Sequence, residues 1–147
     1  MNSENVVLLA ETLPDDEFLF HYTLRRAGLD NPVVVVRDGA ETVAYLKGEG
    51  KFADPQAFPL PRILMLDLGM PRISGWQILK WLRSEPQFDD LLVVVLTASS
   101  QVEDLRRAYQ LGANSFLTKP CSLEDLVNLA NGYPHHWFHP AEMLAVA

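Results

Sequence analysis

The 147-residue sequence is poor in the features that mark secreted and membrane proteins. It contains one cysteine, Cys121, which excludes an internal disulfide and agrees with a reducing compartment. The first five residues carry no basic segment ahead of an apolar stretch, and no apolar run approaches the roughly 18 residues of a membrane span. The sequence therefore predicts a soluble, cytoplasmic protein without a signal peptide or a membrane segment.

Positive charge is also scarce. The chain has 12 Lys and Arg residues against 19 Asp and Glu residues, which gives a net charge of −7 at pH 7. Surfaces that bind nucleic acids are strongly basic, whereas the Lys and Arg residues here are scattered along the chain. Direct binding of DNA or RNA is therefore not expected.

Five short apolar runs alternate with stretches of helical periodicity, and runs of this length are typical of buried strands. The predicted strands cover residues 6–10, 33–36, 63–66, 92–96 and 115–118. One of the intervening helices follows Ser100-Gln-Val-Glu103, a sequence that predicts a capping box. Because right-handed crossovers place helices on both faces of a parallel sheet, this order predicts one doubly wound α/β domain with a five-stranded parallel sheet.

Polar side chains follow four of these strands at their carboxyl ends. They are Glu11, Thr12, Asp67, Thr97 and Lys119. Each of them alone is most simply a turn residue or a solvated charge. Because the carboxyl ends of parallel strands meet at one edge, where open α/β folds hold ligands, we expect the group to lie together. Carboxylates, a hydroxyl and an ammonium form a set that suits phosphoryl transfer.

With their neighbours, these strand ends resemble the receiver domain of two-component response regulators. The matching residues are Glu11, Pro14-Asp15-Asp16, Asp67-Leu-Gly-Met-Pro71, Ser74-Gly75, Thr97-Ala98 and Lys119-Pro120. The resemblance covers about residues 5–131 and implies the flavodoxin-like strand order 2-1-3-4-5. We expect a receiver domain at residues 1–132 and an aromatic tail at 133–147 with no output domain. A long connection at 48–61 and this tail are similar to the stand-alone regulators associated with bacterial phytochromes.

The resemblance also implies roles for individual residues. Asp67 would accept a phosphoryl group from a sensor histidine kinase or a phosphotransfer protein, and Thr97 and Lys119 would stabilise the phosphoryl oxygens. Mg²⁺ would be held by Glu11, Asp67 and the backbone carbonyl of Gly69. The peptide bond after Lys119 would be cis. Such a protein is a phosphoacceptor in signalling rather than an enzyme, although it can dephosphorylate itself.

Thr12 departs from the family pattern, in which an acid at this position binds the metal directly. The threonine would leave the site one negative charge short. Since Mg²⁺ demands near-octahedral oxygen ligands, its binding would be weakened or absent. Two interpretations remain open: a phosphorylatable receiver with weakened metal binding, and a pseudo-receiver that signals through protein contacts alone.

Two further residues are candidates for signal output. In this family the signal passes to an aromatic residue on the fifth strand, and Phe116 occupies that position. Because Phe116 has no hydroxyl, a switch would act through packing. Tyr109 would lie on the surface formed by the fourth helix, fifth strand and fifth helix, which is the usual interface in this family. We expect a homodimer, with Trp137 and Phe138 docked on the domain or on a second subunit.

A phosphatase-type hydrolase is a weaker alternative. Phosphatases of the haloacid-dehalogenase type also place an Asp after a parallel strand, but they need a second acid two residues on, where Gly69 stands. The sequence contains no glycine-rich phosphate loop, nucleophile-elbow serine or dinucleotide fingerprint.

Overall fold

The computed structural model describes residues 5–138 and contains one five-stranded sheet. All neighbouring strands are parallel, in the order β2-β1-β3-β4-β5, which confirms the predicted fold. The strands are β1 (Val7–Ala10), β2 (Val33–Val36), β3 (Ile63–Asp67), β4 (Leu92–Thr97) and β5 (Ser115–Thr118).

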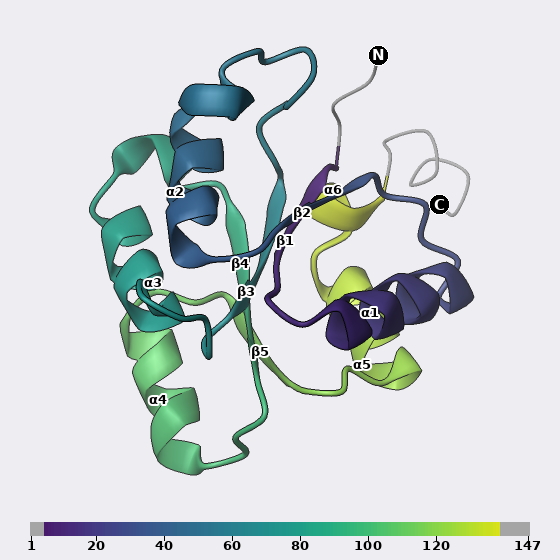
Figure 1. The fold of residues 1–147 in the computed structure, drawn as a ribbon. Coiled ribbons are helices and arrows are strands. Elements are labelled where there is room, and N and C mark those ends of the chain that lie inside the picture. Colours follow the sequence, from purple (N-terminus) through teal and green to yellow (C-terminus); the bar gives the residue numbers. More distant parts are fainter. Residues whose placement is uncertain (1–4, 139–147) are drawn as a thin grey trace.

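Helices cover both faces of this sheet (Figure 1). They are α1 (Pro14–Arg26), α2 (Gly39–Lys47), α3 (Gly75–Arg83), α4 (Val102–Gln110), α5 (Leu123–Gly132) and α6 (Pro134–Trp137). Two short 3₁₀ helices lie at Gly50–Phe52 and Pro86–Phe88. Helices α2, α3 and α4 lie on one face, and α1, α5 and α6 lie on the other (Figure 1). None of the helices within residues 5–138 is both long and apolar enough to cross a membrane.

The sheet separates two hydrophobic cores. Successive side chains of a strand point to opposite faces, so Leu8 and Leu64 pack on the side of α2 and α3, while Leu9 and Met65 pack on the side of α1 and α5. Strands β1, β3 and β4 are buried along their whole length. Burial on both faces explains why these strands appear in the sequence as continuous apolar runs.

The start of α4 differs from the prediction, and the capping box at Ser100 is wrong. The helix begins at Val102, and Gln101 precedes it without a side-chain cap. Two local hydrogen bonds to hydroxyl groups take the place of the capping box. The Thr97 hydroxyl accepts one from the Ser99 N–H (3.1 Å), and the Ser99 hydroxyl accepts one from the Gln101 N–H (3.2 Å). Such local bonds keep the backbone out of the helix.

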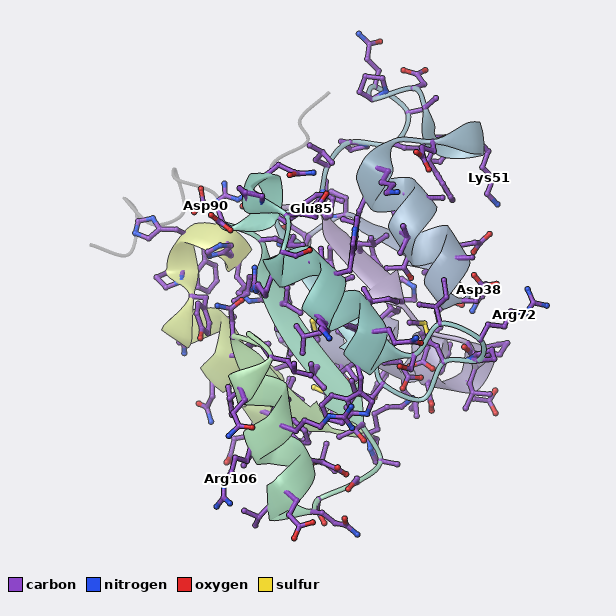
Figure 2. The ribbon with its side chains drawn as sticks, turned by 90° about the vertical axis from the view of Figure 1, so that its left-hand side faces the viewer. Asp38, Lys51, Arg72, Glu85, Asp90 and Arg106 are labelled. Carbon is purple, nitrogen blue, oxygen red and sulfur yellow. The ribbon has the colours of Figure 1, made fainter. Side chains whose placement is uncertain are left out.

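The connection after β2 packs against the connection after β3. Asp38 caps α2 by accepting a hydrogen bond from a backbone N–H of the first turn (2.8 Å). A Cβ atom on Gly39 would lie 2.4 Å from the Ile73 carbonyl oxygen, so this close approach requires glycine. Asp38 and Arg72 accordingly lie close together at one edge of the molecule in Figure 2. The contact fixes the segment that follows β3.

The first part of the predicted tail packs on the domain. Trp137 is 2% exposed and belongs to the core between the sheet, α1 and α5, which confirms its predicted docking on the domain. The Asn31 side chain donates a hydrogen bond to the Trp137 carbonyl (3.2 Å), and Arg62 donates one to the His135 carbonyl (3.3 Å). Phe138 packs against the same core, and residues 139–147 lie outside the described residues.

Replacing Trp137 with alanine should lower the free energy of unfolding by about 3–5 kcal/mol, because a buried aromatic side chain is removed from a packed core. Urea denaturation measures this change. The matched control is His135→Ala on the same helix, where the exposed side chain should matter by less than about 0.5 kcal/mol. Similar stability of the two variants would contradict the docking of Trp137.

Candidate functional site

Three of the predicted site residues meet in direct contact at the carboxyl edge of the sheet. Glu11 follows β1, Asp67 ends β3, and Lys119 follows β5. The Lys119 ammonium lies 3.0 Å from Glu11 Oε1 and 3.1 Å from Asp67 Oδ2. Thr97 ends β4, one residue beyond Leu96, which pairs with Asp67. The sheet order therefore brings the predicted residues to one rim.

The Asp67 carboxylate is held from two sides. Its Oδ1 accepts a hydrogen bond from the Gly69 N–H (2.9 Å), and its Oδ2 pairs with Lys119. The N-terminus of α3 packs closely behind it, since a Cβ on Gly75 would lie 2.7 Å from the Leu68 Cα and 2.8 Å from the Asp67 carbonyl oxygen. The backbone around Asp67 is therefore fixed, and its side chain keeps 10% of its surface exposed.

Asp16 is a site residue that the sequence interpretation did not assign. Its Oδ2 lies 2.8 Å from the Lys119 ammonium, closer than the oxygens of Glu11 and Asp67. Three carboxylates therefore surround Lys119, while the predicted lack of a negative charge at position 12 stays a prediction. Pro14-Asp15-Asp16 gave part of the signal, since a proline that begins a helix directly after the rim keeps the first turn near it, but it does not fix where Asp16 points.

Burial and charge act in opposite directions on this group. Burial raises the pKa of Glu11, and the hydrogen bond from Lys119 opposes this effect. Burial alone would lower the pKa of Lys119, but the carboxylates of Asp16, Glu11 and Asp67 outweigh it and raise that pKa well above its usual value. Lys119 is therefore a permanent cation at the centre of the acids.

Thr12 takes no part in this charged group. Its hydroxyl donates a hydrogen bond to the Arg37 carbonyl (2.9 Å), in the connection that follows β2. The side chain thus joins two loops at the rim and adds no charge beside Lys119. Its doubtful role as a metal ligand stays a prediction.

The oxygens of Glu11, Asp16 and Asp67 are hard donors of the kind that Mg²⁺ prefers. As they stand, they converge on the Lys119 ammonium, and within residues 5–138 no three acidic, His or Cys side chains are arranged around a metal position. The oxygen donors fit Mg²⁺ by their chemistry, and the Lys119 ammonium would compete with Mg²⁺ for the same carboxylates. Gly69 uses its N–H on Asp67, and the ligand role of its carbonyl stays a prediction.

The two candidate output residues lie away from this group. Phe116 on β5 is half-buried and packs against the core that contains α2 and α3. Tyr109 on α4 is 47% exposed and borders a shallow groove lined by Val102, Leu105 and Arg106. No described contact joins Thr97 to either residue, so their signalling roles stay predictions.

Comparison with known proteins decides the family. The model of the response regulator receiver domain matches residues 7–131. The chain belongs to the response regulator receiver domain family. Its sequence is 30% identical to the response regulator Rcp1 of Synechocystis over 98% of this receiver and 96% of Rcp1.

Solved structures of phytochrome-related regulators resemble this receiver as well. RPA3017, from red light signalling in R. palustris, has a TM-score of 0.79 and 32% identity, with 91% of this receiver and 94% of that chain covered. The Mn²⁺-bound form of Rcp1 has a TM-score of 0.73 and 30% identity, with 92% and 95% covered. Phosphorylated RcpA, a cyanobacterial phytochrome response regulator, has a TM-score of 0.74 and 31% identity, with 91% and 94% covered.

Lys119→Met should lower the free energy of unfolding by about 2–3 kcal/mol at pH 7 without Mg²⁺, because three carboxylates lose their shared cation. The loss should shrink towards pH 4.5. The reason is that removal of Lys119 raises the pKa of Glu11 in the folded variant further above its unfolded value of 4.5. Protonated Glu11 then stabilises the folded variant at low pH, and this stabilisation is lost as the pH rises through the pKa of Glu11 in the folded state.

Urea denaturation of both proteins at pH 4.5 and pH 7 tests this dependence. The control is Lys51→Met, in which an exposed lysine loses its pair with Glu41 and stability should change by less than about 0.5 kcal/mol. A difference between wild type and Lys119→Met that is equal at the two pH values would contradict the expected coupling.

Proposed function

We propose that this receiver accepts a phosphoryl group on Asp67 from a sensor histidine kinase or a phosphotransfer protein and signals through protein contacts. The observation that carries the proposal is the Asp67 carboxylate, held by the Gly69 N–H and by Lys119 at the carboxyl rim of the sheet, with 10% of the side chain exposed. A nucleophile needs this combination of fixed geometry and access.

In the proposed reaction, a carboxylate oxygen of Asp67 attacks the phosphorus of a phosphohistidine. The bond between phosphorus and nitrogen breaks, and its electron pair stays on the imidazole. The products are an aspartyl phosphate and a free histidine. Lys119 stabilises the charge of the phosphoryl oxygens, and the Thr97 hydroxyl stands on the adjacent strand end to donate to them.

We assign Mg²⁺ as the cofactor, with Glu11, Asp67 and the Gly69 carbonyl as the groups that would hold it. When bound, Mg²⁺ supplies positive charge that offsets the charge of the phosphoryl group. The Mn²⁺-bound Rcp1 and phosphorylated RcpA support both parts of the proposal. Because Thr12 contributes a neutral hydroxyl, we expect weaker Mg²⁺ binding than with a carboxylate at this position.

The donor protein would approach across α1. A cleft beside the site is lined by Glu11, Asp16, Leu19 and Lys119, among others. Exposed apolar side chains continue from this cleft along α1, and they include Leu13, Phe18, Leu19 and Tyr22. An apolar patch that adjoins a reactive carboxylate suits the histidine-bearing helix of a kinase or a phosphotransfer protein.

A second copy of the chain is the proposed partner of α4. Val102 and Tyr109 expose apolar surface there, and the helix carries acidic residues in its first turn and basic residues further on. Figure 2 shows Arg106 pointing away from α4. Both signs of charge on one helix allow a two-fold pairing in which the acids of each copy meet the arginines of the other.

Tyr109→Asp should shift the protein from dimer to monomer, because it places a charge in the apolar centre of this interface. Light scattering at several concentrations measures the change. Tyr22→Asp is the matched control, since Tyr22 is a similarly exposed tyrosine on α1. A wild type that is monomeric at every concentration would remove the homodimer. Deleting residues 133–147 is a poorer test, because it removes Trp137 from the core.

Two other functions have weaker support. In a pseudo-receiver, Lys119 would hold the acids permanently and only protein contacts would signal, which the three ion pairs of Lys119 allow. A hydrolase of the haloacid-dehalogenase type would need a second acid two residues after Asp67, and Gly69 occupies that position. Turnover of a small phosphate ester by the purified protein would favour the hydrolase.

A small phosphodonor such as acetyl phosphate, with Mg²⁺, should label wild type once, on Asp67. Intact-mass spectrometry measures the added phosphoryl group, and Asp67→Asn should remain unlabelled, because its amide is not a nucleophile. Labelling of both proteins would remove Asp67 from its role. Labelling of neither would favour the pseudo-receiver.

A further inference from the structure

We infer that Asp16 supplies the carboxylate that position 12 lacks, and that cation binding at the rim depends on it. Asp16 then acts as a positioning residue: it fixes the Lys119 ammonium and contributes negative charge to the site. This inference rests on the proposed function, because it concerns the site at which Asp67 would be phosphorylated.

The contacts of Lys119 carry the first step. An ammonium group has three N–H donors. Three carboxylates lie within bonding distance of it, with Asp16 Oδ2 at 2.8 Å, Glu11 Oε1 at 3.0 Å and Asp67 Oδ2 at 3.1 Å. Asp16 is the nearest of the three acids, so its loss would remove the shortest ion pair of the ammonium. Asp16 accordingly helps to determine where the ammonium lies.

The fold explains why an acid at position 16 can replace one at position 12. The chain leaves β1 at Ala10, and α1 begins at Pro14, so the first helical turn lies directly beside the rim. The Leu13 N–H donates a hydrogen bond to Glu11 Oε2 (3.3 Å), which holds this junction compact. Asp16 is the third residue of α1 and points back to Lys119, whereas the Thr12 hydroxyl bonds to the Arg37 carbonyl.

Charge and exposure carry the last step. Because Asp16 Oδ2 and Asp67 Oδ2 lie 2.8 and 3.1 Å from one nitrogen, these oxygens are at most 5.9 Å apart. At such separations each carboxylate adds substantially to the attraction of a divalent cation. The Asp16 side chain is 28% exposed, and that of Glu11 is 2% exposed. Asp16 is thus the member of the group that an entering cation meets first.

Titration of the full chain with Mg²⁺ by calorimetry tests this inference. Asp16→Asn should weaken Mg²⁺ binding about tenfold. Asp15→Asn is the matched control, because it removes the same charge from the same helical turn at an exposed position. It should change the affinity by less than about threefold, as expected for a screened surface charge.

The Asp15→Asn control separates a specific role from a general electrostatic effect, and a charge swap tests whether a carboxylate at position 12 can replace Asp16. If Asp16 stands in for the acid missing at position 12, then adding Thr12→Asp to Asp16→Asn should restore Mg²⁺ affinity to within about threefold of wild type or better. Equal affinities of Asp16→Asn and Asp15→Asn would overturn the inference, and so would a swap variant that stays as weak as Asp16→Asn.

The same proteins distinguish failure of the inference from failure of the function. Wild type that takes label on Asp67 but binds no Mg²⁺ in the titration would overturn the role of Asp16 and leave the phosphoacceptor function intact. Absence of both labelling and binding would overturn both. Labelling of wild type together with the expected order of Mg²⁺ affinities supports both.

Discussion

The ammonium of Lys119 is shared by three carboxylates, and the carboxyl rim of the sheet depends on this arrangement. Glu11 arrives from the end of β1, Asp16 from α1 and Asp67 from β3, so one cation joins three elements that would otherwise repel one another. Without that cation, Glu11 would be a buried and unpaired charge, which costs several kcal/mol. The same contacts place the ammonium where a phosphoryl group on Asp67 would develop charge, so structure and proposed chemistry depend on one side chain.

Much of the fold could be predicted because its buried strands leave a clear record in the sequence. The bounds of β2 and β5 agree with the predicted ranges, since polar or turn residues interrupt the apolar runs on both sides. Strands β3 and β4 each run one residue further than predicted, through Asp67 and Thr97. Hydropathy describes side chains, whereas the ladder is made by backbone groups, and a polar side chain at the rim does not end it.

The features that escaped prediction depend on side-chain direction and on competing local bonds. Periodicity places Asp16 in the first turn of α1, but only the packing of α1 on the sheet turns it towards Lys119. At the start of α4, Ser100 precedes Glu103 with the spacing of a capping box. The hydrogen bonds to the Thr97 and Ser99 hydroxyls determine the backbone conformation there. The spacing of Ser100 and Glu103 alone does not reveal these bonds.

The docking of α6 separates two ends of the molecule. Arg62 and Asn31, which hold this segment, lie just before β3 and β2, at the amino edge of the sheet, while Asp67 lies at the carboxyl edge. The exposed position of His135 on α6 thus offers a place for a spectroscopic label that leaves the approach to Asp67 clear. A change in the signal of such a label after phosphorylation would therefore mean that a structural change had passed through the length of the sheet.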